Sequence, residues 1–350
     1  MRTQSLLIVI LLALIGGTSC NRSSKPKQSI FMKRATGFAY EVLVVMDKDA
    51  WKGEAGRLLY GQLTASIPGL PQNEPTMRVT YAEPSQFDGL LRYVRNIMVV
   101  RVNPSQYTKV SVHKEKDVWA TGQEVITLNV PSSQQLMEYL TEHGASLVAY
   151  LEGKERERAT GYLERAHSAW VNEKVKERFN ASLYVPEEMC SYKDTVDFFW
   201  VTDHGKQGRT DLIVYSFPYT SNRTFTLDYL VSMRDSILGE QIPGAFPNSY
   251  MTTVKRLPPS YEAINRNGEY CGVVRGLWEL EGDMMGGPFV SHARLDEKNN
   301  RVVVVEGFVF APETDKRNFI RRIESALYTL RLPGEFEETA IEKPDVPEEK

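Results

Sequence analysis

The sequence predicts an α+β protein with two similar domains of mixed α/β sheet, which follow a lipoprotein signal peptide. Three observations lead to this prediction. The first twenty residues have the pattern of an export signal. The remaining chain alternates short β-branched apolar runs with amphipathic helical stretches. The same succession of elements then occurs twice, and a chain of 350 residues is long enough for two domains of about 150 residues each.

The N-terminal segment is typical of a bacterial lipoprotein signal. A basic start at Arg2 precedes Leu6–Ile15, an unbroken apolar run of ten residues. Ten residues rise only about 15 Å as a helix, half the thickness of a bilayer, so this run cannot span a membrane. Small residues lead directly into Cys20, as in a lipobox whose cysteine receives acyl chains such as palmitate. An ordinary secretory signal is the alternative, because Gly17 stands where lipoboxes carry an aliphatic residue.

The distribution of charge excludes one class of partner. The net charge is −3, but residues 335–350 carry seven acidic residues and two lysines. The rest of the chain is nearly neutral, which argues against nucleic acid as a partner. We expect the acidic tail to be disordered, with a binding tail as the alternative. Residues 20–36 form a basic polar tether, either a simple spacer or a contact for anionic lipid head groups.

The predicted first domain covers residues 37–180. Its predicted strands are 41–46, 77–81, 96–102, 107–113 and 124–130. A helix over 51–66 ends before Pro68, since the residue that precedes a proline is disfavoured in helices. A second helix begins after Ser132, which can cap it, and 154–179 is a charged helix that closes this domain or bridges to the next.

The predicted second domain covers residues 181–334. Its predicted strands are 182–185, 196–201, 211–217, 250–254, 269–280, 289–295 and 301–310, and its predicted helices are 224–241 and 316–330. A helix that ends at Ile-Pro-Gly, followed by strands and a closing helix, occurs at Ile67-Pro68-Gly69 and again at Ile242-Pro243-Gly244. This order suggests an internal duplication, and a coincidence between two α+β arrangements is the alternative.

Known catalytic and metal-binding motifs are absent from the sequence. It has no nucleophile elbow, phosphate-binding loop, zinc motif or Cys-x-x-Cys, and its five histidines are scattered. We therefore predict no metal site and no cofactor, and the catalytic residues, if any exist, remain unknown. Cys190 and Cys271 either form a disulfide in an exported protein or are two small buried residues.

Two segments are candidate binding surfaces. The run from Arg275 to Phe289 joins a tryptophan, two methionines and a glycine pair before proline, which indicates a specially shaped turn or bulge. Flexible methionines suit an adaptable apolar contact, and a hairpin with these side chains in the core is the alternative. A second aromatic cluster follows Asp117. The candidate surface residues are Trp119, Gln123, Arg275, Trp278, Met284, Met285 and Phe289.

Several short motifs together resemble one family. They include Leu70-Pro-Gln72 with Glu74-Pro75, Arg275-Gly-Leu-Trp278, Met285-Gly-Gly-Pro-Phe289 and Lys316-Arg317. The pattern is similar to an uncharacterised family of Bacteroidota lipoproteins, domain of unknown function 4837, over nearly the whole mature chain. The resemblance implies a cell-envelope lipoprotein and carries no established site residues.

The sequence therefore predicts an envelope lipoprotein without enzymatic activity, anchored through Cys20. We expect the outer membrane, on its periplasmic face, and a binding or accessory role toward an envelope protein or an apolar ligand. The rival hypothesis is an envelope hydrolase that uses acids such as Asp117 or Asp283 in a cleft. Ionisable side chains that converge with perturbed pKa values would favour the rival, and a broad exposed apolar patch would favour binding.

Overall fold

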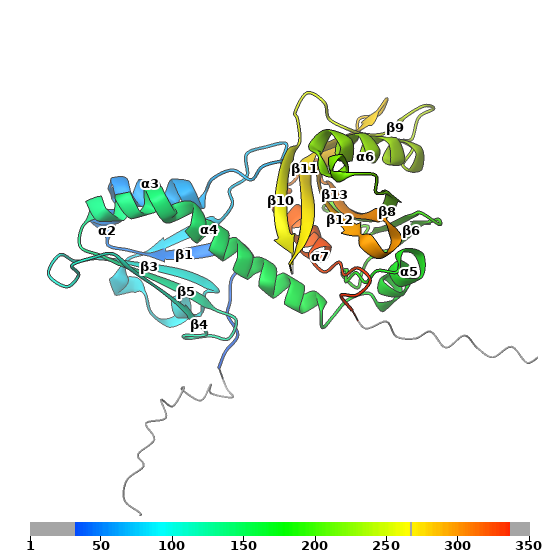
Figure 1. Cartoon of the computed structure of the whole chain (residues 1–350). Helices are drawn as coiled ribbons and strands as arrows, with labels where there is room; N and C mark the ends of the chain where they lie inside the picture. The colour runs from blue at the N-terminus through cyan, green and yellow to red at the C-terminus, as the bar shows by residue number, and fades with distance from the viewer. Residues whose placement is uncertain (1–31, 267, 337–350) are drawn as a thin grey trace, which may run out of the picture.

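The protein folds into two α+β domains, each built around its own sheet (Figure 1). The structure is a computed structural model that describes residues 32–266 and 268–336. The first sheet has five strands in the order β2-β1-β3-β5-β4. The second has eight, in the order β10-β11-β12-β13-β8-β7-β6 with β9 beside β11. Within the described residues, no strand pair joins the two sheets.

The first sheet is parallel except at one edge. β1 (Glu41–Val45) pairs in parallel with β2 (Arg78–Ala82) and β3 (Asn96–Val102), and β3 pairs in parallel with β5 (Glu124–Val130). β4 (Ser111–Lys116) is antiparallel to β5. The three central strands are almost completely buried, as is usual for parallel strands with both faces covered.

The two faces of this sheet are covered differently. The helices α2 (Lys48–Lys52), α3 (Glu54–Leu63) and α4 (Ser133–Leu163) lie on one face and enclose the main core of the domain (Figure 1). Residues around two short 3₁₀ helices, η1 (Pro84–Gln86) and η2 (Gly89–Tyr93), pack against part of the other face. That face has no long helix over it in the part of the chain that the structure describes.

Helix α4 belongs to both domains. It has 31 residues, and its N-cap is Ser132, whose side chain accepts a hydrogen bond from the backbone N–H of Gln135. A helix of this length extends about 46 Å. Leu140 and Leu151 are buried in the first core, whereas Leu163 at its C-terminal end is buried in the second core. The helix therefore runs as a continuous rod from one core into the other.

The second sheet is antiparallel at every pairing in the described residues. Helix α6 (Leu227–Gln241), preceded by η3 (Asn222–Phe225), packs on one face, and α5 (Ala169–Phe179) and α7 (Arg317–Leu327) pack on the other. The strands are β6 (Cys190–Asp194), β7 (Phe198–Thr202), β8 (Arg209–Pro218), β9 (Tyr250–Thr253), β10 (Ser260–Arg266), β11 (Glu269–Glu281), β12 (Gly286–Asp296) and β13 (Arg301–Phe310), with η4 (Glu297–Asn299) between the last two.

A loop of the first domain caps the last helix of the second. Glu74 is only 4% exposed, and its carboxylate accepts hydrogen bonds from the backbone N–H groups of Lys316 and Arg317, both at 2.7 Å. The Arg317 side chain also donates to the carbonyl of Pro75 at 3.1 Å. A carboxylate at this position satisfies N–H groups that have no partner inside the helix, and it complements the helix dipole. The cap thus fixes α7 against the first domain.

The predicted α+β class is confirmed, because each half has helices, a sheet and a core of its own. The candidate duplication does not extend to topology. The central strands of the first sheet are parallel, whereas the second sheet is antiparallel and has a different strand order. Ile242-Pro243-Gly244 follows the end of α6 directly, whereas Ile67-Pro68-Gly69 lies in a loop after α3, which ends at Leu63. The two helices are followed by unlike sheets.

The structure moves the domain boundary by one helix. The sequence places it between residues 180 and 181, with 154–179 as one helix. In the structure α4 ends at Leu163, and α5 packs Val171 and Val175 into the second core. The apolar side chains of α5 face the second sheet, and α5 therefore belongs to the second domain. The turn at residues 164–168 therefore separates the domains.

A few predicted strands differ from those observed. The strand predicted at 107–113 lies at 111–116, and 182–185 is not a strand, since Ser182 makes only an isolated bridge with Arg331. Neither β6 nor β10 corresponds to a predicted strand. β10 is an edge strand with mostly polar, exposed residues, and an apolar run is therefore missing.

Some predictions concern residues outside the described ranges. The signal peptide, the lipidated Cys20, the larger part of the tether and residues 337–350 of the tail belong to this group. Glu335, placed in the tail by the sequence analysis, is instead attached to the second domain through an ion pair with Arg294. Among the helices that the structure describes, none has the length and apolar character needed to cross a bilayer.

The Glu74 cap gives a test of how the domains hold together. Glu74→Ala should lower the free energy of unfolding by about 2–4 kcal/mol, because two buried N–H groups lose a charged acceptor. Glu74→Gln keeps one oxygen acceptor and should cost less. Chemical denaturation measures both changes. Glu142→Ala, at an exposed position, is the control, and an equal loss in this control would contradict the assignment.

Candidate ligand pocket between the two domains

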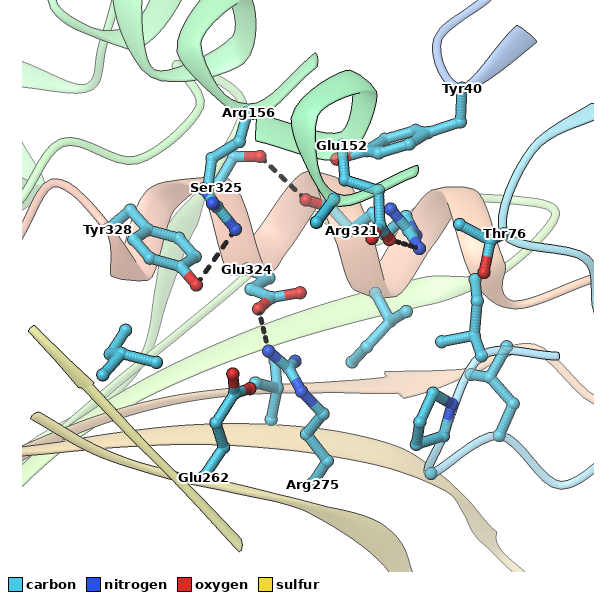
Figure 2. A pocket seen from close by; sticks show the side chains of 18 of the residues that line it. Tyr40, Thr76, Glu152, Arg156, Glu262, Arg275, Arg321, Glu324, Ser325 and Tyr328 are labelled. Atoms are coloured by element: carbon cyan, nitrogen blue, oxygen red, sulfur yellow. Dashed lines mark hydrogen bonds and ion pairs between the residues drawn. The ribbon is translucent and has the colours of Figure 1, made fainter. Parts of the chain in front are cut away.

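A cavity of about 420 Å³ lies between the two domains (Figure 2). We call it the interdomain pocket. Its walls are the loop that follows α3, the middle of α4, strands β10 and β11, and one side of α7. A cavity of this size and position is typical of a site for a small ligand. Its charged side chains are Glu152, Arg156, Glu262, Arg275, Arg321 and Glu324.

Close packing of the loop against the sheet depends on Gly69. Its φ of +80° lies in the left-handed region, which favours glycine. A Cβ atom at this position would lie 3.2 Å from the Cβ of Arg275 and 3.3 Å from the backbone nitrogen of Gly276. The loop of the first domain therefore packs so closely on β11 that a side chain at position 69 would be too close to the strand. The Ile67-Pro68-Gly69 segment lies in the loop after α3, which ends at Leu63, and forms a wall of the pocket.

One face of α7 supplies much of the lining. Arg321, Glu324 and Ser325 of α7 and Tyr328 at its C-cap recur at helical spacing and point toward the pocket (Figure 2). Ile320 of α7 also lines it. The Glu74 cap holds the first turn of this helix. Because the helix is fixed at its N-terminus and packed on the second sheet, the charged groups are held in place by the backbone.

Arg275 and Glu324 form the central ion pair. The Nη2 of Arg275 lies 2.6 Å from Oε1 of Glu324 (Figure 2). Burial alone would raise the pKa of Glu324, but the adjacent Arg275 guanidinium outweighs it, and the pKa is lowered. Burial likewise acts to lower the pKa of Arg275, and Glu324 outweighs it and raises that pKa. Both groups are therefore held in their charged forms.

His292 lies behind this pair and stays neutral. Its ring is 1% exposed, and burial lowers its pKa to about 3. Its Nε2 is 4.0 Å from Glu324, and its ring packs edge-on against Tyr328 with centroids 4.7 Å apart. Neither ring nitrogen has a hydrogen-bond partner among the described residues. The nearby arginines and the dry surroundings outweigh the attraction of Glu324 for a proton.

Arg321 connects the domains across the top of the pocket. It pairs with Glu152 of α4, and its guanidinium lies 4.2 Å from the ring centroid of Tyr40 in the first domain (Figure 2). Burial raises the pKa of Tyr40, which therefore stays un-ionised. The Nε of Arg321 is buried and has no partner in the described part of the chain. This leaves one strong donor unused.

Arg156 and Glu262 add two less constrained charges. Arg156 donates to the hydroxyl of Tyr328 at 3.1 Å and lies 4.3 Å from the centroid of its ring. Burial raises the pKa of Tyr328 to about 12. Glu262 on β10 is exposed and accepts no hydrogen bond within residues 32–266 and 268–336. The pocket thus has cationic and anionic groups with unused hydrogen-bonding capacity.

The predicted site residues are divided between several places. Arg275 and Phe289 line the pocket. Trp278 is 3% exposed and belongs to the core of the second domain, and Met285 packs partly against that core. Met284 is 100% exposed. The candidates in the Arg275–Phe289 segment therefore do not form one continuous contact surface, since Met284 is the one candidate among them with an exposed side chain.

The remaining candidates lie elsewhere. Trp119 and Gln123 are in the first domain, and neither lines the interdomain pocket. The two acids of the hydrolase hypothesis do not meet in this pocket either. Asp117 accepts from the backbone N–H of Gly122, and Asp283 accepts from that of Met284, so both stabilise turns.

The glycine pair before Pro288 has a different role from the predicted turn. Gly286 and Gly287 lie inside β12, and a Cβ on Gly287 would lie 2.0 Å from the carbonyl oxygen of Val309. The turn itself lies before them, with Gly282 at a φ of +78°. The pair therefore permits close backbone packing next to Trp278. The two cysteines are free, with Cys190 exposed and Cys271 buried.

Sequence reasoning missed most of the pocket. Glu152 and Arg156 lie on α4, Arg321 and Glu324 lie on α7, and Tyr328 is the C-cap of α7. The sequence predicts helices in these regions but no site. The signal that could have found them is a charged residue at an inward position. Arg321 follows the buried Ile320 directly, and Glu324 follows the buried Ile323.

Two family models match the chain, one for each domain. Residues 168–329 match Domain of unknown function (DUF4837). Residues 35–164 match a separate model, Domain of unknown function (DUF8532). The similarity to DUF4837 noted in the sequence is therefore supported over residues 168–329 and not over nearly the whole chain, because residues 35–164 match a separate model. The division between the models coincides with the turn at 164–168.

Other comparisons add little. No curated protein matches the chain. Among solved structures, the E65A mutant of protein Mog1 has a TM-score of 0.28 and 7% identity over 43% of this chain and 90% of its own. The Saccharomyces cerevisiae Ran-binding protein Mog1p has a TM-score of 0.28 and 7% identity, and the match covers 43% of this chain and 89% of Mog1p. The human StarD13 (DLC2) lipid transfer and protein localization domain has a TM-score of 0.22 and 7% identity, and the match covers 46% of this chain and 92% of that domain. TM-scores this low support no functional argument.

His292 should make the protein less stable in acid. The unfolded chain binds a proton on this residue below about pH 6.5, whereas the folded protein binds one only below about pH 3. Between these values the unfolded state holds more protons, so the free energy of unfolding falls as the pH decreases. From pH 7 to pH 5 the loss should be about 2 kcal/mol.

Denaturation curves at both pH values measure this effect. His292→Phe keeps an aromatic ring but cannot titrate, so its stability should fall less between them. His143→Phe, at a partly exposed histidine on α4, should behave like the wild type. An unchanged pH dependence in His292→Phe would show that the buried histidine is not the cause.

Proposed function

We propose that the chain is a lipid-anchored envelope protein that binds a small zwitterionic ligand, such as a free amino acid or a short peptide, in the interdomain pocket. The observation that carries this proposal is the presence of unused groups of both signs around one cavity. Arg321 has a buried Nε without a partner, and Glu262 has a carboxylate that accepts no hydrogen bond in the described residues.

The charge pattern favours a ligand that carries both signs. An anionic group alone would be attracted to Arg156 and Arg321 but repelled by Glu262. A cationic group alone would be attracted to Glu262 but repelled by Arg156 and Arg321. A zwitterion places its carboxylate near the arginines and its ammonium near Glu262, and each contact is a charge-assisted hydrogen bond. The fixed pairs at Arg275 and Arg321 keep the walls in place while the ligand binds.

The converging ionisable groups also bear on the hydrolase alternative. Such convergence is the observation expected of an enzyme, yet the direction of the pKa shifts argues otherwise. General acid–base catalysis works best with a pKa near neutrality. The pKa of Glu324 is lowered, that of Tyr328 is raised to about 12 and that of His292 is about 3. Each shift fixes one protonation state, which suits recognition better than proton transfer.

The anchor part of the proposal rests on the sequence. Residues 1–19 have the order of a lipoprotein signal, and the basic tether leads into the first domain at Lys33 and Arg34. The resemblance to Bacteroidota lipoproteins supports the same location, the cell envelope, with the outer membrane and its periplasmic face as our specific proposal.

Trialanine is a suitable first probe of the pocket, because it is a small zwitterionic peptide. Isothermal titration should show saturable binding, and Glu262→Gln should weaken it about tenfold, the effect of losing 1.4 kcal/mol. N-acetyl-trialanine amide lacks both charges and should bind far less. Glu269→Gln removes an exposed carboxylate from the neighbouring strand and should leave affinity unchanged. Equal binding of the blocked peptide, or no binding of trialanine, would overturn the zwitterion assignment.

Cys20→Ser tests the anchor separately. Each buried methylene of an acyl chain contributes about 0.8 kcal/mol, and two or more chains give stable attachment. The substituted protein should therefore leave the membrane fraction after cell fractionation. If it still sediments with membranes after a high-salt wash, the lipid anchor at Cys20 is wrong or is not the main attachment.

A further inference from the structure

A second cavity lies on the opposite face of the first sheet from α4. Its volume is about 860 Å³, and we call it the sheet groove. Its lining residues on the strands include Val45, Val99 and Val125, which point away from the core under α3 and α4. Those two helices cover the other face of the sheet (Figure 1). It is separate from the interdomain pocket, because every residue that lines it belongs to the first domain. Those used below are Asp47, Phe87, Arg92, Arg101, Asn103, His113, Glu115, Trp119, Thr127 and Asn129.

The strand register places polar side chains together on this face. Thr127 of β5 stands between Val99 of β3 and His113 of β4. Two residues further along β5, Asn129 is opposite Arg101. Residues two apart on a strand point to the same side. The floor of the groove is therefore apolar near the sheet centre and becomes polar toward the edge.

The groove also lies where parallel sheets commonly bind ligands. The chain leaves β1 to form β2 on one side and then crosses to form β3 on the other. Ligands of open α/β sheets bind beyond the carboxyl ends of the strands at such a reversal. Asp47 follows β1 and Asn103 follows β3, and both line the groove.

A buried amide in the groove has an unused acceptor. Asn129 is 8% exposed, and its Oδ1 has no hydrogen-bond partner in the described residues. Its Nδ2 makes only a long contact of 3.5 Å with the hydroxyl of Ser111. A buried carbonyl oxygen without a donor is costly and rare. A ligand hydroxyl in the groove would supply the missing donor.

Trp119 is held rigidly at the rim. Its backbone N–H donates to the side chain of Gln123 at 3.0 Å, and that side chain donates to the carbonyls of Arg92 and Val94, both at 2.7 Å. The indole packs edge-on against Phe87 with centroids 5.4 Å apart. Trp119 remains only partly buried, so a fixed aromatic surface borders the groove. Such a surface suits the C–H face of a sugar ring or the plane of a base.

The charges separate these two ligand classes. In nucleotide-binding sheets the phosphate occupies the turn after the first strand, at a glycine-rich helix start. Here that turn carries Asp47-Lys48-Asp49 and no glycine, so two carboxylates oppose a phosphate. Elsewhere in the groove Arg92 and Arg101 accompany Glu115 and His113. The balance of charges matches an uncharged, hydroxyl-rich ligand.

We infer that the sheet groove binds a neutral oligosaccharide, with Trp119 stacked on a sugar ring and Asn129 accepting a hydrogen bond from a hydroxyl. Carbohydrate hydroxyls are satisfied by planar polar side chains such as those of Asn129, Asp47 and Asn103. The volume of the groove lies in the range of small-molecule sites and accommodates more than one sugar ring. This inference goes beyond the zwitterion proposal and does not depend on it.

A glycan microarray probed with the full chain in detergent identifies the preferred sugar, and isothermal titration with that oligosaccharide measures its affinity. We expect Trp119→Ala to weaken binding tenfold or more and Asn129→Leu to weaken it by a similar factor. Trp170→Ala is the matched control, since Trp170 is a partly exposed tryptophan on α5 of the other domain. It should leave the affinity unchanged.

Three results would overturn the inference. The first is no saturable binding to any neutral glycan on the array. The second is sugar binding that survives both Trp119→Ala and Asn129→Leu. The third is competition by adenosine at equal or higher affinity, which would make the groove a nucleoside site. Circular dichroism checks that each variant is folded. If Trp119→Ala does not fold, Trp119→Phe, which keeps a smaller aromatic face, tests the stacking instead. Intermediate affinity in that variant is the expected result, and unchanged affinity counts against stacking.

Discussion

Both domains depend on one helix that is shared between their cores. Helix α4 packs Leu140 and Leu151 under the first sheet and Leu163 under the second. Between these two anchors it presents Glu152 and Arg156 to the interdomain pocket. The cap that Glu74 places on α7 adds a second connection at the other side of the pocket. Apart from the loop that follows α3, the pocket walls are two fixed helices and a sheet, which hold side chains more precisely than a loop does.

Much of the fold follows from local sequence patterns. Apolar runs such as 41–46 and 124–130 predict buried strands, because only a covered sheet can accept side chains of that kind on both faces. β10 has no such run, since an edge strand leaves half of its residues in water. The break between α4 and α5 is equally hard to predict, because both segments have strong helical composition. Tertiary packing of α5 on the second sheet decides it.

The candidate sites are less predictable, because they form from residues distant in sequence. Arg275 attracted attention as part of an unusual motif, but its partner Glu324 lies on a helix predicted only for its apolar face. Trp278 and Trp119 look alike in sequence. Trp278 lies in β11 and fills a core, whereas Trp119 lies in the turn between β4 and β5 and borders a groove. Asn129 gave no signal, since an asparagine in an apolar strand reveals its unpaired oxygen only after the sheet is assembled.

The continuity of α4 also fixes an angular relation between the domains. Each residue of an α-helix advances the chain by about 100° around its axis. Insertion or deletion of a single residue between Leu151 and Leu163 would therefore rotate one core by that angle relative to the other, and it would turn Arg156 away from Tyr328. Related chains should tolerate length changes in the connecting loops and keep this stretch of α4 at constant length.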